Sequence, residues 1–194
     1  MPVCASFSPG AGNRRARDFA AKALASCAGL CYNAAVKGKK GAAAMQKITS
    51  FTVDHDKLKE GIYVSRVDGD VTTYDLRTRV PNAGEYMDTT TAHTVEHMFA
   101  TFVRNSAIRE DVLYFGPMGC RTGFYLLVRN ADNARVLEIV RQVLAQILAY
   151  DGPVFGGTQK ECGNFRDLDL AKAKAECARY LEVLARPQSF RYDA

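Results

Sequence analysis

The sequence lacks any long apolar stretch. No run in its 194 residues approaches the roughly 18 apolar residues that a membrane-spanning helix needs, so we expect no membrane segment. Hydrophobic residues make up 47% of the chain and charged residues 24%, which is the balance of an ordinary soluble globular protein. The length suits one domain with a substantial buried core.

The chain after residue 44 also lacks an excess of positive charge. The formal net charge is +5, but residues 1–44 alone contain seven basic residues against one acidic residue. The remaining residues contain 19 basic and 20 acidic side chains, so this part is close to neutral. The charge balance therefore does not indicate a nucleic-acid partner.

A disulfide framework is absent as well. Three of the six cysteines lie in residues 1–44, and the other three are Cys120, Cys162 and Cys177. Three cysteines cannot all pair with one another, and the spacing is not that of a small secreted disulfide protein. We expect a reducing, cytoplasmic setting.

Residues 1–44 differ in composition from the rest. They are rich in Ala, Gly, Lys and Arg and contain few large apolar residues. The Arg-rich, acid-poor composition resembles a transit peptide, and Ala20–Leu30 faintly resembles the apolar part of a signal peptide, which Lys22 interrupts. We interpret residues 1–44 as an extension outside the fold, or as a start upstream of the natural one, and residues 45–194 as the folded domain.

Patterns of strands and helices begin after Met45. Residues 48–53 are β-rich, and 62–67 with 71–76 form a predicted hairpin around Asp68-Gly69-Asp70. Two further short strands are predicted at 111–115 and 124–128.

Three helices are predicted from apolar spacing and capping residues. The first begins at a cap among Thr89, Thr90 and Thr91 and runs to about Asn105. The second follows Asp132, and the third covers about 168–184, with Cys177 on its apolar face as a small buried hydrophobe. Without a βαβ rhythm, the order predicts an α+β fold with a mostly antiparallel sheet packed against helices.

The first of these helices contains the motif H-x-x-E-H, formed by His93, Glu96 and His97. Helical geometry places the three side chains on one face, where two imidazoles four residues apart can bind a single metal ion. A carboxylate beside them can move protons. A catalytic site usually has a third protein ligand, and Cys120 or Cys162 could be that ligand or a reactive thiol.

Three motifs in this order closely resemble the S-ribosylhomocysteine lyase family, also called LuxS. They are H-T-V-E-H-M-F-A from residue 93, G-P-M-G-C-R-T-G-F-Y from 116 and E-C-G-N-F-R-D from 161. The likeness runs from about Lys47 to the C-terminus. It implies that His93, His97 and Cys162 bind one Fe²⁺ per subunit, which Zn²⁺ or Co²⁺ can replace, and that Glu96 and Cys120 are the acid/base pair.

The resemblance also implies the reaction. The family converts S-ribosyl-L-homocysteine into L-homocysteine and 4,5-dihydroxypentane-2,3-dione, the precursor of autoinducer-2 in quorum sensing, by carbonyl migration and β-elimination of the thiol. This chemistry requires repeated proton removal next to a carbonyl, which a thiol of lowered pKa can perform near neutral pH. The same step belongs to the activated methyl cycle.

Substrate contacts follow from the same likeness. Ser50, His55 and Arg77 match family positions that bind substrate, partly across a homodimer interface, and a guanidinium suits a carboxylate or sugar hydroxyls. Many members have an aspartate six residues before the catalytic cysteine, where this chain has Tyr114. Tyr114 or a neighbouring main-chain group is then expected to take over that contact.

Two other readings of the motif remain open at this point. In an inverted-motif metallopeptidase, Glu96 would activate water, but those enzymes are longer and use a downstream glutamate as third ligand. In a structural zinc domain that binds a partner, Cys120 would be the fourth ligand of a closed site.

Overall fold

The computed structural model describes residues 45–48 and 51–192, and its central element is a four-stranded sheet. The strands lie in the order β1 (Gly61–Asp68), β2 (Val71–Arg77), β4 (Gly123–Arg129) and β3 (Val112–Pro117). Every neighbouring pair is antiparallel, as the sequence predicts. The described residues from Gln46 onward form one compact unit, whereas the extension predicted for residues 1–44 lies outside the described part.

The predicted hairpin is confirmed. Asp68 pairs with Val71, so that Gly69 and Asp70 alone make the turn between β1 and β2. Gly69 has φ of +61°, a backbone conformation that a residue without Cβ adopts at no steric cost. No strand is present among the described residues before β1, where the sequence suggested β structure.

Three helices follow the predicted order: α2 (Thr89–Val103), α3 (Asn133–Ala149) and α4 (Leu170–Ala185). Each begins after an aspartate whose carboxylate accepts a backbone N–H of the first turn; these are Asp88, Asp132 and Asp169. The prediction of a threonine cap for α2 was wrong, because the carboxylate of Asp88 takes the Thr91 N–H at 2.7 Å. None of the described helices is both long enough and apolar enough to cross a membrane.

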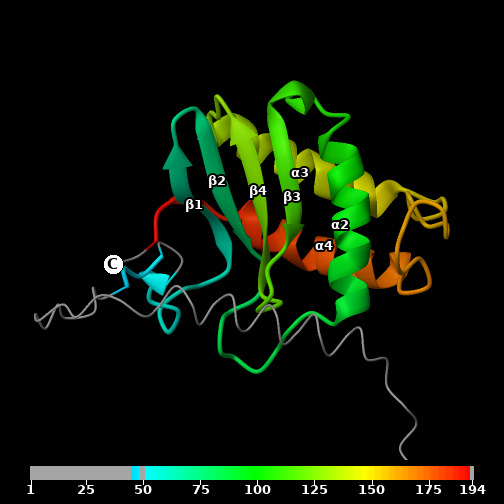
Figure 1. Ribbon diagram of the computed structural model, residues 1–194, viewed down its shortest axis with the longest axis horizontal. Helices are drawn as coiled ribbons and strands as arrows, with labels where there is room; N and C mark the ends of the chain where they lie inside the picture. Colours follow the sequence, from blue (N-terminus) through cyan, green and yellow to red (C-terminus); the bar gives the residue numbers. More distant parts are fainter. Residues whose placement is uncertain (1–44, 49–50, 193–194) are drawn as a thin grey trace, which may run out of the picture. The chain divides into compact units, whose positions relative to one another are not determined.

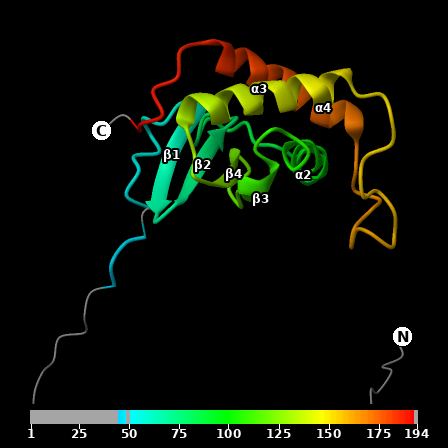
Figure 2. The same cartoon turned by 90° about the horizontal axis from the view of Figure 1, so that it is seen from above.

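The helices cover one face of the sheet. Figures 1 and 2 show α3 and α4 side by side behind the strands, with α2 flanking the β3 edge. Along β4, Phe124, Leu126 and Val128 are buried against these helices, and Cys177 of α4 is part of the same core. The alternate residues Tyr125 and Leu127 lie on the other face, because side chains alternate along a strand. No described helix or strand covers that second face (Figure 2).

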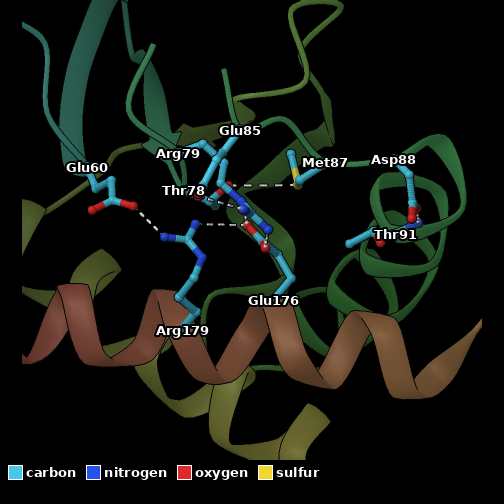
Figure 3. A network of polar contacts seen from close by, with 9 residues as sticks. All are labelled: Glu60, Thr78, Arg79, Glu85, Met87, Asp88, Thr91, Glu176 and Arg179. Atoms are coloured by element: carbon cyan, nitrogen blue, oxygen red, sulfur yellow. Dashed lines mark hydrogen bonds and ion pairs between the residues drawn. The ribbon is translucent and has the colours of Figure 1, made fainter. Parts of the chain in front are cut away.

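A buried charge network connects α4 to the chain that leaves β2 (Figure 3). Glu176, which is only 3% exposed, accepts hydrogen bonds from Arg79 and Arg179, and Arg179 also pairs with Glu60. Arg79 lies two residues after Arg77. The network therefore holds in place the end of the strand that carries Arg77.

Candidate metal centre

Two histidines and a cysteine converge beside α2. The ligand atoms of His93, His97 and Cys162 all lie within 4.8 Å of one another, and Cys162 Sγ is 3.4 Å from His93 Nε2. The histidines are one helical turn apart, as the motif requires, while Cys162 comes from the loop between α3 and α4. The structure thus brings together the three residues expected to bind metal.

Both imidazoles are oriented by backbone carbonyls. His93 Nδ1 donates to Asp167 O at 2.9 Å, and His97 Nδ1 donates to Phe155 O at 2.7 Å. A nitrogen that faces a carbonyl must carry the proton, so each Nε2 keeps a lone pair for a metal. Two imidazoles and a thiolate form a donor set that suits Fe²⁺, Co²⁺ or Zn²⁺. The residues present therefore fit a divalent metal.

Threonines of α2 hydrogen-bond the loop that carries Cys162. Thr94 Oγ1 donates to Thr90 O and accepts the Asp169 N–H at 2.8 Å, and the Thr90 hydroxyl donates to the Asp167 carboxylate. The Asn164 N–H points at Cys162 Sγ from 3.4 Å, which supports a thiolate. Sequence reasoning missed these threonines because only the folded loop brings their partners, about 75 residues away, within reach.

Gly156 is a further residue that the sequence reasoning did not single out. It has φ of +65°, and a Cβ at this position would lie 3.2 Å from His97 Nδ1. Its neighbour Phe155 supplies the carbonyl that orients this imidazole. The one sequence signal was the glycine-rich break after α3, which marks a turn but does not indicate contact with a histidine.

Cys120 lies in the turn between β3 and β4 and is exposed. Its Sγ is 3.1 Å from Thr122 Oγ1 and 3.8 Å from Arg77 Nη1. Partial burial raises the pKa of the thiol, but the Thr122 hydrogen bonds and the Arg77 charge outweigh it, so the pKa is lowered from its ordinary value. This environment favours a reactive thiolate.

Arg77 is itself buried and paired. Its Nη2 lies 2.5 Å from Asp75 Oδ2, and its Nη1 donates to Thr122 Oγ1 at 2.6 Å. The pKa of Asp75 is raised, because the effect of burial exceeds the opposing effect of Arg77. The pKa of Arg77 is raised as well, because the effect of burial is outweighed by the nearby Asp75 carboxylate. The guanidinium therefore remains charged beside the thiol.

Glu96 connects the metal ligands to the turn that carries Cys120. Glu96 and His93 line one hollow together with His97 and Cys162. The same two residues line a second hollow with Gly119 and Arg121, the neighbours of Cys120 on either side. Glu96 thus lies between the metal-ligand group and the residues that flank Cys120 in the chain.

The structure describes some of the expected substrate-binding residues and not others. His55 lies before β1, with Nδ1 hydrogen-bonded to Val53 O at 2.9 Å. Tyr114 is 49% exposed and lines a hollow on the uncovered sheet face with Tyr125 and Leu127. Ser50 lies outside the described residues.

Comparison with known proteins identifies the family. A model of the S-ribosylhomocysteinase (LuxS) family matches residues 48–189. The chain is 43% identical to an S-ribosylhomocysteine lyase of Borrelia garinii over 146 residues, which cover 72% of this chain and 93% of that one. It is 46% identical to the enzyme of the same name from Desulfotalea psychrophila over 147 residues, covering 72% and 92%, and 44% identical to that of Finegoldia magna over 145 residues, with the same coverage.

Proposed function

The chain belongs to the S-ribosylhomocysteinase (LuxS) family, and from this premise we propose that it is a metal-dependent S-ribosylhomocysteine lyase. It cleaves S-ribosyl-L-homocysteine to L-homocysteine and 4,5-dihydroxypentane-2,3-dione. The proposal is supported by the convergence of His93, His97 and Cys162 and, separately, by Cys120, a thiol of lowered pKa in the turn before β4.

We propose Fe²⁺, one per subunit, as the metal, with Zn²⁺ or Co²⁺ as substitutes. His93, His97 and Cys162 would hold it, and three protein ligands leave a coordination position for substrate. When bound, the ion supplies a Lewis acid that polarises a substrate oxygen.

Cys120 is the group that takes up and returns a proton next to the carbonyl. Arg77 and Thr122 stabilise its thiolate, which is the form that accepts the proton. Each shift of the carbonyl along the sugar requires that one proton be removed from carbon and one be returned to carbon. After each shift Cys120 is again a thiolate.

Glu96 serves the oxygen and leaving-group side of the reaction. In the elimination, a proton leaves the carbon next to the carbonyl, the C–S bond breaks, and the departing thiolate takes up a proton from an acid. Glu96 lines both hollows, toward the metal ligands and toward the Cys120 turn, and can exchange protons on either side.

A homodimer completes the site. The second face of the sheet carries Tyr114, Tyr125 and Leu127 and is uncovered in the described part of the chain. Such an apolar face is suited to a second copy of the chain, and the substrate contacts of His55, Arg77 and Ser50 are then shared across the interface.

The setting follows from the reaction. We propose a cytoplasmic enzyme of the activated methyl cycle, whose dione product is the precursor of autoinducer-2 in quorum sensing. The catalytic domain is residues 45–194, and we expect it to keep lyase activity when residues 1–44 are removed.

The direct test is release of a free thiol from S-ribosylhomocysteine by purified protein loaded with Fe²⁺ or Co²⁺. Thiol release and dione formation should be equal in amount. An absence of thiol with full metal occupancy would refute the lyase assignment.

The other two readings of the motif are less well supported. In the described structure Cys120 contacts Arg77 and Thr122 and is not part of the converging ligand group, which argues against a closed four-ligand zinc domain. X-ray absorption at the metal edge distinguishes the two, because a closed site would show four protein ligands and no exchangeable position. A metallopeptidase would use a carboxylate as third ligand where this chain has Cys162.

A further inference from the structure

The segment after α4 returns to the sheet and places Tyr192 beside β1. Val64 N donates to Phe190 O at 2.8 Å, and the Tyr192 ring stacks on Tyr63 with centroids 4.9 Å apart. Figure 1 shows this segment running alongside β1. The phenol Oη then donates to Asp75 Oδ2 at 3.0 Å.

Asp75 is 1% exposed, so its carboxylate depends on protein donors. Its Oδ2 accepts from both Tyr192 and Arg77, while Oδ1 has no hydrogen-bond partner among the described residues. Oδ2 thus accepts both hydrogen bonds. Removing either donor leaves the negative charge of the carboxylate to interact more strongly with the other donor.

Arg77 connects the Asp75 carboxylate to the Cys120 thiol. One of its terminal nitrogens is bound to Asp75, and the other donates to Thr122 and lies 3.8 Å from Cys120 Sγ. A continuous series of contacts therefore runs from Tyr192 through Asp75 and Arg77 to Cys120.

We propose that Tyr192 is a positioning residue for Cys120. By donating to Asp75, it satisfies part of the carboxylate charge, so that the Arg77 guanidinium is less fully neutralised and remains available to the thiolate. The role assigned to Cys120 rests on the proposed function. The contacts that connect the two residues do not.

The other titratable groups near Asp75 are His55, Tyr63, Tyr125 and Tyr180, together with Arg77 and Cys120. A substitution at Tyr192 leaves all of them in place. Tyr192→Phe also keeps the aromatic ring, and thus the stacking on Tyr63, and removes only the hydroxyl, which hydrogen-bonds Asp75 and also Ser65.

The test is the pH dependence of Cys120 alkylation by iodoacetamide in the full-length, metal-loaded protein. Mass spectrometry of tryptic peptide 110–121 reports Cys120 separately from the other cysteines. In Tyr192→Phe we expect the apparent pKa of Cys120 to rise by about half a unit, with alkylation near pH 7 about threefold slower. Tyr150→Phe is the matched control, because it loses a hydroxyl that bonds Pro153 O instead.

Unchanged alkylation in Tyr192→Phe would overturn the proposal. So would a loss of reactivity accompanied by a lower melting temperature or metal content, since this would indicate a structural role. In the lyase assay the variant should lower kcat with little change in KM. Because alkylation does not require turnover, a wild-type protein without lyase activity would refute the proposed function and leave the coupling of Tyr192 to Cys120 measurable.

Discussion

The two cysteines of the candidate site have different surroundings. Cys162 lies 3.4 Å from His93 Nε2, whereas Cys120 lies beside Arg77 and Thr122. We expect Cys162→Ala to abolish stoichiometric metal binding. Cys120→Ala should keep the metal and lower turnover by at least about 10²-fold, the usual range for an acid/base group. Metal analysis of both proteins and the thiol-release assay test this, and the reverse pattern would show that the roles are exchanged.

Gly156 is a second residue whose identity the site requires. Gly156→Ala adds a Cβ at positive φ and 3.2 Å from His97 Nδ1, so the imidazole must move. We expect metal affinity to fall by about tenfold, the effect typical of disturbing groups that orient a ligand. A competition titration with a chelating dye measures it.

Gly69→Ala is the matched control for Gly156→Ala. Its φ of +61° imposes the same backbone strain, but no atom lies within 4 Å of the added Cβ. It should lower stability by about 1 kcal/mol and leave metal affinity unchanged. Equal metal affinities in the two variants would contradict the proposed contact with His97.

At the scale of elements, Glu176 links α4 to the end of β2. Burial raises the pKa of Glu176, but hydrogen bonds from Arg79 and Arg179 outweigh it and lower the pKa below the ordinary value of 4.5. The stabilisation is therefore complete above the unfolded-state pKa and is lost as the pH falls through the lower, folded-state pKa.

Glu176→Gln tests this link. Near pH 7 we expect it to lower the free energy of unfolding by about 2 kcal/mol, because two arginines lose a buried partner. The difference from wild type should shrink as the pH falls below the usual glutamate range, which urea unfolding at several pH values measures. Glu138→Gln removes an exposed partner of Arg135 and should change stability by less than about 0.5 kcal/mol at any pH. A pH-independent difference for Glu176→Gln would refute the account.

Local patterns predict the elements well because each element's own residues carry the signal. The apolar stripe of α3 follows the helical period of 3.6, and the turn between β1 and β2 follows from the positive φ that Gly69 adopts. The cap of α2 was mispredicted because Asp88 directly precedes three threonines, and both residue types cap helices. Only the fold shows that Thr90 and Thr94 instead hold the loop before α4.

At the scale of the molecule, the uncovered sheet face should be a subunit interface. Leu127→Glu places a charge at its centre and should convert a dimer at micromolar concentration to a monomer with much reduced lyase activity. Sedimentation velocity measures the mass. Gln146→Glu adds the same charge to the exposed surface of α3 and should leave the protein dimeric. A wild-type monomer with full activity would refute the shared site.

The sequence by itself determined the helix that carries His93, Glu96 and His97, because a four-residue spacing on a helix places side chains on one face wherever the helix lies. Residue chemistry left Cys120 and Cys162 interchangeable, and only the resemblance to a family distinguished them. The tertiary structure decided the rest. Carbonyls of Phe155 and Asp167 orient the imidazoles, and Tyr192 contacts Asp75 across 117 residues of chain. These contacts depend on how distant segments pack, which neither propensity nor spacing encodes.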